Sequence, residues 1–427
     1  MTLATDQVML TLAGLAYRGF QDALPGEPHE LIVRRAVSEG LDTLPPVRGA
    51  WELVWGPVTS RVPLGVFDSN AMYVVRNRQA PHRYVVALRG TNPIASSDWL
   101  FGDLLVGTTV RWPYAADGAA ISTSTAVGLD MLQRMRAGPP STMARLTETA
   151  AAAAKERLGP LIGAGRAAVA GAVAAAGPAA AGPARSAAAL EKHIASVVQH
   201  WNLSPPPLDE LRRQFRRAEA AVRLGPAGLR PKLMPAGSRD GGLDLLTFLG
   251  SQADGSREAL EVSVTGHSKG GALAPAVALW LRDALDSGAA EECWDASRRA
   301  RVACHAFAGP TPGNATFARR LEQRLGENQR YIRNRNDVVP QAWQVSDLQR
   351  IPALYGGLAS VFGPVLARII EGVGPLDYRH VQVGVEAFDG TLTGGPLAAE
   401  MIHQHLDAYL EKLGLRAQGI TAITFFI

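Results

Sequence analysis

The hydrophobic positions of the chain gather in short continuous runs within the first ninety residues and again after residue 260. The run at 84–88 is apolar throughout, which is typical of a strand buried on both faces. Helical patterns separate the later runs. Strands that alternate with helices predict an α/β fold with a mostly parallel central sheet and helices on both faces. The predicted strands are residues 51–55, 71–75, 84–88, 262–265, 301–307 and 330–333.

Helical periodicity fills most of the remaining sequence. Residues 1–13 predict an amphipathic helix, and 397–413 predict the last helix of the chain. The Pro- and Gly-rich sequence after the first helix predicts a loop, and 378–388 is strand-like. Further helices are predicted at residues 126–135, 243–249, 272–285 and 315–325.

The sequence around residue 268 predicts a nucleophile elbow. A β-branched run leads into Gly266-His267-Ser268-Lys269-Gly270, and a helical pattern follows at once. The two glycines remove side chains that would collide where strand and helix approach each other. The N-terminus of the helix points its N–H groups at any developing oxyanion. A chance match in a chain with 44 glycines is the alternative, and the flanking strand and helix argue against it.

The composition changes between residues 133 and 239, where Ala, Arg, Gly and Pro dominate. We expect a large Ala-rich helical insertion within a single domain, 1–427. Its uncharged stretch, 167–184, is interrupted by Gly-Pro pairs and does not predict a transmembrane helix. Two interpretations stay open: a lid or membrane-contacting element, or a solvent-exposed insertion. The arginine-rich amphipathic stretch 208–222 fits either an anionic lipid surface or packing on the core.

Charge and cysteine content narrow the functional classes. The net charge of +4 is spread over many arginines, so no nucleic-acid site is expected. Two cysteines do not make a disulfide framework. The N-terminus has no basic region, and Asp6 interrupts its apolar run, so no secretory signal is predicted. We expect a cytoplasmic protein, with peripheral membrane association or export without a cleaved signal left open.

Five sequence blocks together resemble the class 3 (fungal-type) lipases of the α/β-hydrolase superfamily. They cover the early strands and the C-terminal half, whereas the Ala-rich insertion has no recognised counterpart. Lys269 stands where a hydrophobic residue or Gln is more usual, and Thr91 replaces the Ser of some members. The blocks are residues 85–91 with Asp98, Trp99 and Asp103, then 264–274, 305–310 with Gly313, Asn314 and Phe317, 331–340, and 405–410.

The resemblance implies an α/β-hydrolase fold and a catalytic triad. Ser268 would be the nucleophile, His405 the general base and Asp337 the orienting acid. The backbone N–H groups of Lys269 and Thr91 would form the oxyanion hole, and no metal or cofactor is implied. The chain order Ser, Asp, His agrees with this fold.

The residues alone leave rivals for each assignment except the serine. His403 lies two positions from His405 and competes with it as the base, whereas His267 is expected to point away from the nucleophile and His380 to be structural. Asp240 and Asp244 compete with the acid, although they precede the elbow. The sequence around Thr91 equally fits a plain strand-to-helix loop.

We therefore expect a serine carboxylester hydrolase that acts on lipid esters, of the triacylglycerol lipase or phospholipase A type, through an acyl-enzyme intermediate. The insertion would supply any peripheral membrane contact. A serine peptidase or thioesterase on the same fold is one alternative. A catalytically inactive lipid- or partner-binding protein and a membrane-damaging lipase effector are the others.

Overall fold

The computed structural model describes residues 2–18, 29–61, 68–89, 106–138, 242–287, 292–355 and 358–422. The expected insertion at 133–239 therefore lies almost wholly outside the described residues. The same holds for the amphipathic stretch 208–222, so its two interpretations stay predictions. Among the described residues, no helix has the length and apolarity needed to cross a bilayer.

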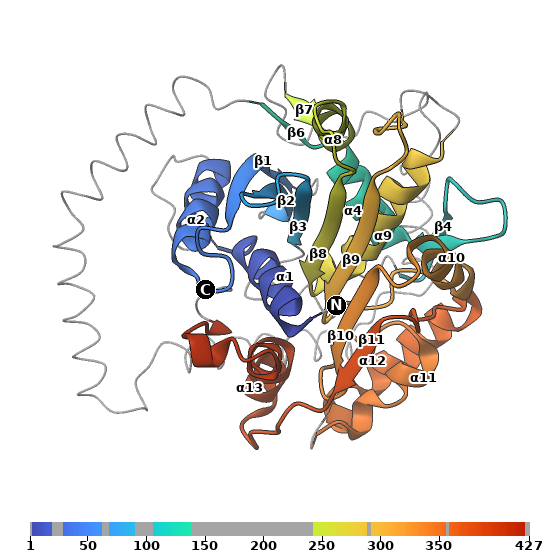
Figure 1. Cartoon of the computed structure of the whole chain (residues 1–427). Helices are drawn as coiled ribbons and strands as arrows, with labels where there is room; N and C mark the ends of the chain where they lie inside the picture. Colours follow the sequence, from blue (N-terminus) through green and yellow to red (C-terminus); the bar gives the residue numbers. More distant parts are fainter. Residues whose placement is uncertain are drawn as a thin grey trace, which may run out of the picture.

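A seven-stranded sheet in the order β1-β2-β3-β8-β9-β10-β11 forms the centre of the molecule (Figure 1). β1, β2 and β3 pair antiparallel, and every later pair is parallel, so the mostly parallel sheet is confirmed. The pairing of β3 with β8 joins the chain before the insertion to the chain after it. The strands are β1 (Trp51–Arg61), β2 (Asp68–Asn77), β3 (Arg83–Arg89), β8 (Glu261–His267), β9 (Arg301–Phe307), β10 (Gln329–Asn334) and β11 (Val385–Phe388).

Helices cover both faces of this sheet. Val86 and Val264 belong to a buried cluster with α9 (Lys269–Leu285). Val85 and Ala87, which point the other way, pack with α1 (Leu3–Leu15) and α14 (Ala408–Lys412). Because successive strand side chains face opposite sides, this alternation places the helices on opposite faces. The elbow residues at the end of β8 therefore lie between two packed layers.

Shorter elements surround the sheet. Two small ribbons pair β4 (Thr109–Arg111) with β5 (Ala120–Ser122) and β6 (Arg136–Ala137) with β7 (Leu243–Asp244). A third apolar cluster joins residues beside Asp337 to the helices inserted between β10 and β11. The other helices are α2 (His29–Thr43), α4 (Thr123–Gln133), α8 (Leu245–Asp254), α10 (Ala315–Leu325), α11 (Val345–Leu348), α12 (Leu358–Val373) and α13 (Leu397–Ile402), with short turns η2 (Ile351–Ala353), η3 (Gly374–Leu376) and η5 (Arg416–Gln418).

Two local predictions were wrong. The expected loop after the first helix contains α2, whose Val33, Val37 and Leu41 recur every four residues and are buried. The Pro- and Gly-rich residues 19–28 themselves lie outside the described residues. The strand-like run 378–388 forms a strand only at β11. The predicted last helix is confirmed, and its middle turn, η4 (His403–Asp407), is π-helical.

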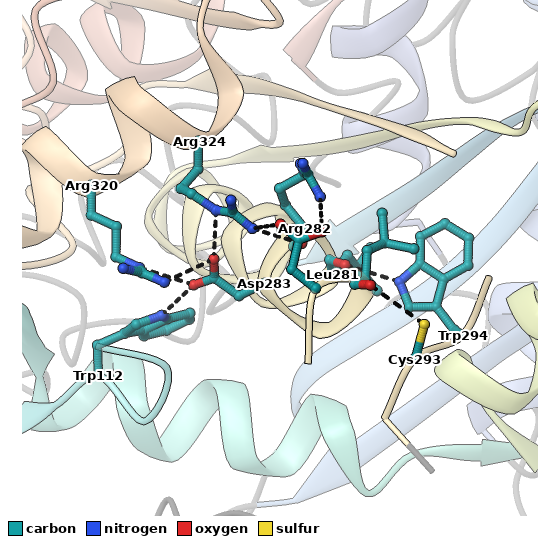
Figure 2. A network of polar contacts seen from close by, with 10 residues as sticks. Trp112, Leu281, Arg282, Asp283, Cys293, Trp294, Arg320 and Arg324 are labelled. Atoms are coloured by element: carbon teal, nitrogen blue, oxygen red, sulfur yellow. Dashed lines mark hydrogen bonds and ion pairs between the residues drawn. The ribbon is translucent and has the colours of Figure 1, made fainter. Parts of the chain in front are cut away.

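A buried ionic network fixes the far end of α9 (Figure 2). The Asp283 side chain is 1% exposed and accepts hydrogen bonds from the Trp112 indole at 2.8 Å and the Arg324 Nε at 2.8 Å. Two of the Arg320 nitrogens, Nε and Nη2, donate to its oxygens at 3.1 Å each. Arg320 and Arg324 come from α10, and Trp112 follows β4. The network therefore ties two separate segments, α10 and the residue after β4, to the helix that follows the elbow.

Candidate active site

Ser268 stands at a sharp turn between β8 and α9. Its φ of 59° and ψ of −129° are rare for a residue with a side chain, which is the backbone expected of a nucleophile elbow. A Cβ built on Gly266 would lie 2.2 Å from the carbonyl oxygen of Gly270. Only glycine permits this approach, as the sequence predicted. The Ser268 N–H donates to the Phe307 carbonyl of β9 at 3.0 Å and so fixes the turn against the sheet.

Asp337 lies in the loop directly after β10, at the carboxyl end of the parallel strands. Its side chain is fully buried, and Oδ2 accepts a hydrogen bond from the His405 Nδ1 at 2.8 Å. The same oxygen accepts from the Tyr409 hydroxyl at 3.1 Å, and Oδ1 accepts from the Val339 N–H at 3.0 Å. Within the described ranges, no Lys or Arg forms an ion pair with this carboxylate. Its charge is therefore met by neutral donors and one imidazole.

His405 lies in the π-helical turn η4, between α13 and α14. Widened helical turns of this kind often mark functional positions. The Asn334 side chain holds the turn, because its Nδ2 donates to the backbone oxygen of Gln404 at 2.9 Å and to its Oε1 at 2.7 Å. Asn334 also accepts from the Gly390 N–H at 2.8 Å. The end of β10, the loop after β11 and the helix of His405 are thus connected by one buried side chain.

The structure places the rival residues elsewhere. His405, and not His403, lies beside Asp337, and the His403 Nε2 has no hydrogen-bond partner among the described residues. Asp244 accepts from the Thr247 N–H at 2.9 Å and caps α8. Asp240 lies outside the described residues. His380 is buried, with its Nε2 2.7 Å from the Pro340 carbonyl oxygen.

The structure describes only one of the two residues expected to form the oxyanion hole. Lys269 directly follows Ser268 and opens α9, so its N–H belongs to the first turn, at the positive end of the helix dipole. Thr91, Asp98, Trp99 and Asp103 lie outside the described residues. β3 ends at Arg89, two positions before Thr91.

Tyr409 is a site residue that sequence reasoning did not single out. Its ring is buried, and burial together with the Asp337 charge raises the pKa of its hydroxyl well above 10.0. It therefore remains a neutral donor. The signal in the sequence was its spacing, since a residue four positions after His405 falls on the same helical face. Tyr409 also accepts a hydrogen bond from the Asn334 N–H at 3.0 Å.

No group of three or more His, Cys, Asp or Glu side chains in the described part of the chain could hold a metal ion. The site thus consists of a serine at a strained turn, a buried imidazole–carboxylate pair and a helix N-terminus. Ester hydrolysis by covalent catalysis needs these parts.

The mostly parallel sheet and the elbow are those of the α/β-hydrolase fold. Residues 249–346, which include Ser268 and Asp337, match the family model "Lipase (class 3)". This match, over less than a quarter of the chain, confirms the resemblance to the class 3 lipases, a family of carboxylic ester hydrolases.

Two solved lipase structures are similar to this chain. The crystal structure of M37 lipase is 24% identical, with the alignment covering 99% of this chain and 95% of that one at a TM-score of 0.65. The crystal structure of Lip2 lipase from Yarrowia lipolytica is 13% identical over 95% and 93% of the two chains, with a TM-score of 0.38. No curated protein matches the sequence. The M37 lipase comparison shows the shared fold.

Proposed function

We propose that the protein is a serine carboxylester hydrolase acting on lipid esters, with Ser268 as nucleophile, His405 as general base and Asp337 as orienting acid. The observation that carries the proposal is the buried 2.8 Å hydrogen bond between His405 Nδ1 and Asp337 Oδ2. With Nδ1 donating to the carboxylate, the neutral imidazole has its lone pair on Nε2. That nitrogen can then accept a proton from a serine hydroxyl.

In the proposed reaction, Ser268 Oγ attacks the ester carbonyl while His405 takes its proton. The oxyanion that forms accepts hydrogen bonds from the N–H groups of Lys269 and Thr91, with the Thr91 hydroxyl as a further donor. Each donor in such a site is typically worth about 3 kcal/mol of transition-state stabilisation. His405 then protonates the leaving alcohol as the ester C–O bond breaks. Water, activated by the same imidazole, hydrolyses the acyl-enzyme and restores Ser268.

The match of residues 249–346 to the lipase family model supports lipid esters as the substrate class. Within that class we propose acylglycerols or glycerophospholipids, two substrates that the same mechanism serves. The insertion remains our candidate for contact with a lipid surface, and it lies outside the described residues. Cytoplasmic residence, with peripheral membrane association, also stays a proposal.

The test is hydrolysis of short- and long-chain p-nitrophenyl esters, a triacylglycerol emulsion and phosphatidylcholine vesicles. Wild type is compared with Ser268→Ala, His405→Ala and, as a matched control, His403→Ala. We expect the first two variants to lose turnover and the control to keep it, and the preferred substrate sets the subclass. A wild type inactive on every ester would favour a lipid- or partner-binding protein that keeps the fold without the activity.

A further inference from the structure

His267 connects the serine turn directly to the helix of the base. It is the residue before Ser268, and its side chain is 1% exposed. Its Nε2 lies 2.9 Å from the backbone oxygen of His405. A carbonyl oxygen only accepts hydrogen bonds, so this nitrogen carries the hydrogen and His267 is the donor. The residue next to the nucleophile is therefore bonded to the backbone of the residue that activates it.

Aromatic rings enclose His267. The ring of His405 lies 4.7 Å away, and that of Tyr409 lies 5.8 Å away and almost perpendicular at 88°. On the α1 side, the Tyr17 hydroxyl donates to the carbonyl oxygen of His267 at 2.8 Å. The end of β8 is thus held from both sides, by Tyr17 shortly after α1 and by the π-helical turn.

The environment keeps His267 neutral. Burial, with a smaller contribution from the His405 charge, lowers its pKa well below 6.5. The ring therefore does not compete for a proton when His405 becomes an imidazolium. It presents the same Nε2–H donor before and after that proton transfer.

We propose that His267 is a positioning residue for His405, and that its hydrogen bond to the His405 carbonyl sets how closely the base approaches Ser268. This inference rests on the proposed function. One peptide bond joins Ser268 to His267, and one hydrogen bond joins the His267 side chain to the backbone of His405. The serine and the base are therefore connected through a single residue. Catalysis is sensitive to such placement, because a shift of about 1 Å costs roughly a hundredfold in rate.

His305 provides a matched control. It lies one strand away, where β9 pairs Thr265 with His305. It is 2% exposed, and burial together with the charge of Arg330 lowers its pKa to about 4. It is thus also a buried neutral histidine of the central sheet. A histidine that only fills the core should respond to substitution as His305 does.

The experiment compares His267→Gln, His267→Asn and His267→Phe with His305→Phe. The amide nitrogen of Gln reaches about as far as the histidine Nε2, whereas that of Asn reaches only as far as Nδ1. We would measure kcat and KM on a p-nitrophenyl ester, count active sites by titration with a fluorophosphonate, and record Tm. Dividing kcat by titrated sites removes the effect of misfolded protein.

We expect His267→Phe and His267→Asn to lower kcat per titrated site by about tenfold to a hundredfold, with KM nearly unchanged. His267→Gln should stay within about threefold of wild type, since each tenfold is 1.4 kcal/mol and the donor is kept. His305→Phe should lower Tm without lowering kcat. If His267→Phe does not fold, the Gln and Asn variants decide the question.

Wild-type kcat in His267→Phe or His267→Asn would overturn the positioning role, as would equal loss in the Gln and Asn variants. A wild type that hydrolyses no ester and takes no fluorophosphonate would overturn the proposed function and this inference together. An active wild type with a fully active His267→Phe would overturn only the inference.

Discussion

Asp283 and Asp337 are both buried carboxylates, yet their hydrogen-bond partners differ in charge. Asp283 is bound by two guanidinium groups and an indole N–H, which compensate its charge permanently (Figure 2). Asp337 receives a tyrosine hydroxyl, a backbone N–H and the His405 imidazole. Among the described residues, its charge is paired with a full positive charge only when His405 takes up a proton.

In the proposed mechanism, this difference separates a structural carboxylate, Asp283, from the orienting acid, Asp337. Fixed cations around Asp283 stabilise the folded state whether or not a reaction occurs. The donors around Asp337 hold its orientation but leave the electrostatic compensation to the step in which the imidazolium forms. Asp283 lies in the last turns of α9, and Ser268 immediately precedes its first turn. The ionic network and the serine turn therefore lie at opposite ends of the same helix.

The largest expected effect is on Asp337. Asp337→Asn should lower kcat by about 10⁴-fold, because the amide favours the wrong imidazole tautomer and leaves the imidazolium uncompensated. We expect Tm to change little, since the side-chain shape is kept. Steady-state kinetics on a p-nitrophenyl ester and thermal unfolding measure both. A variant that keeps a tenth of the wild-type kcat would remove Asp337 from its proposed role.

The second expected effect is a loss of stability without a loss of kcat. Asp283→Ala breaks a buried ionic network and should lower the free energy of unfolding by about 3–5 kcal/mol. Its kcat per titrated site should match wild type. Urea unfolding gives the first quantity, and fluorophosphonate titration with kinetics gives the second.

Asp286 is the control for that experiment. It bonds Arg324 from the same helix region, but its side chain is 41% exposed. Asp286→Ala should cost about 1 kcal/mol or less, because solvent screens exposed ion pairs. Equal costs for Asp283→Ala and Asp286→Ala, or a loss of kcat in Asp283→Ala, would contradict the division between the two carboxylates.

A third effect concerns pH, through buried histidines outside the proposed triad. Burial, with the charge of Arg330, lowers the pKa of His305 to about 4, and burial with the charge of Arg333 lowers that of His380 to about 3. As pH falls below 6.5, the unfolded chain binds protons that the folded chain does not. Stability should therefore fall, by up to about 1.4 kcal/mol per pH unit for each histidine, until the folded pKa is reached.

This pH dependence can be checked by urea unfolding at intervals from pH 7 to pH 5. His305→Gln should flatten the slope by roughly one histidine's share, because it removes one group that titrates only in the unfolded chain. An unchanged slope in His305→Gln would show that His305 titrates alike in both states.

The smallest effect is expected at Tyr409. Tyr409→Phe removes one neutral donor to Asp337 and should lower kcat about tenfold, the rate equivalent of a typical hydrogen bond. Tyr331→Phe is the control, because its buried hydroxyl bonds Gln329 at 3.2 Å on β10, away from Asp337. Equal kcat values for the two variants would show that the Tyr409 hydroxyl does not support the acid.

Local chemistry explains which parts of the site were predictable. The elbow could be found from sequence because its glycines and β-branched run act within ten residues of Ser268. The sheet followed from continuous apolar runs. Chain order reduced the number of aspartates that could be the acid. These features depend on short-range sterics and burial, which the sequence displays directly.

Other parts depend on contacts between distant segments. The residues alone could not decide whether His403 or His405 is the base. The π-helical turn that carries both is held by Asn334, about seventy positions away in the sequence. Tyr409 became meaningful only when Asp337 was placed beside it. The helix α2 was missed because its apolar spacing lies behind a Pro- and Gly-rich start. Thr91 and the insertion stay predictions, since both lie outside the described residues.

The central claim is that Ser268 is a nucleophile activated by His405. The most direct measurement is labelling with a long-chain fluorophosphonate, followed by peptide mass mapping of the adduct. We predict a single adduct on Ser268 in wild type and in His403→Ala, a greatly slowed reaction in His405→Ala, and none in Ser268→Ala. Absence of labelling in wild type, or labelling that persists in Ser268→Ala, would contradict the account.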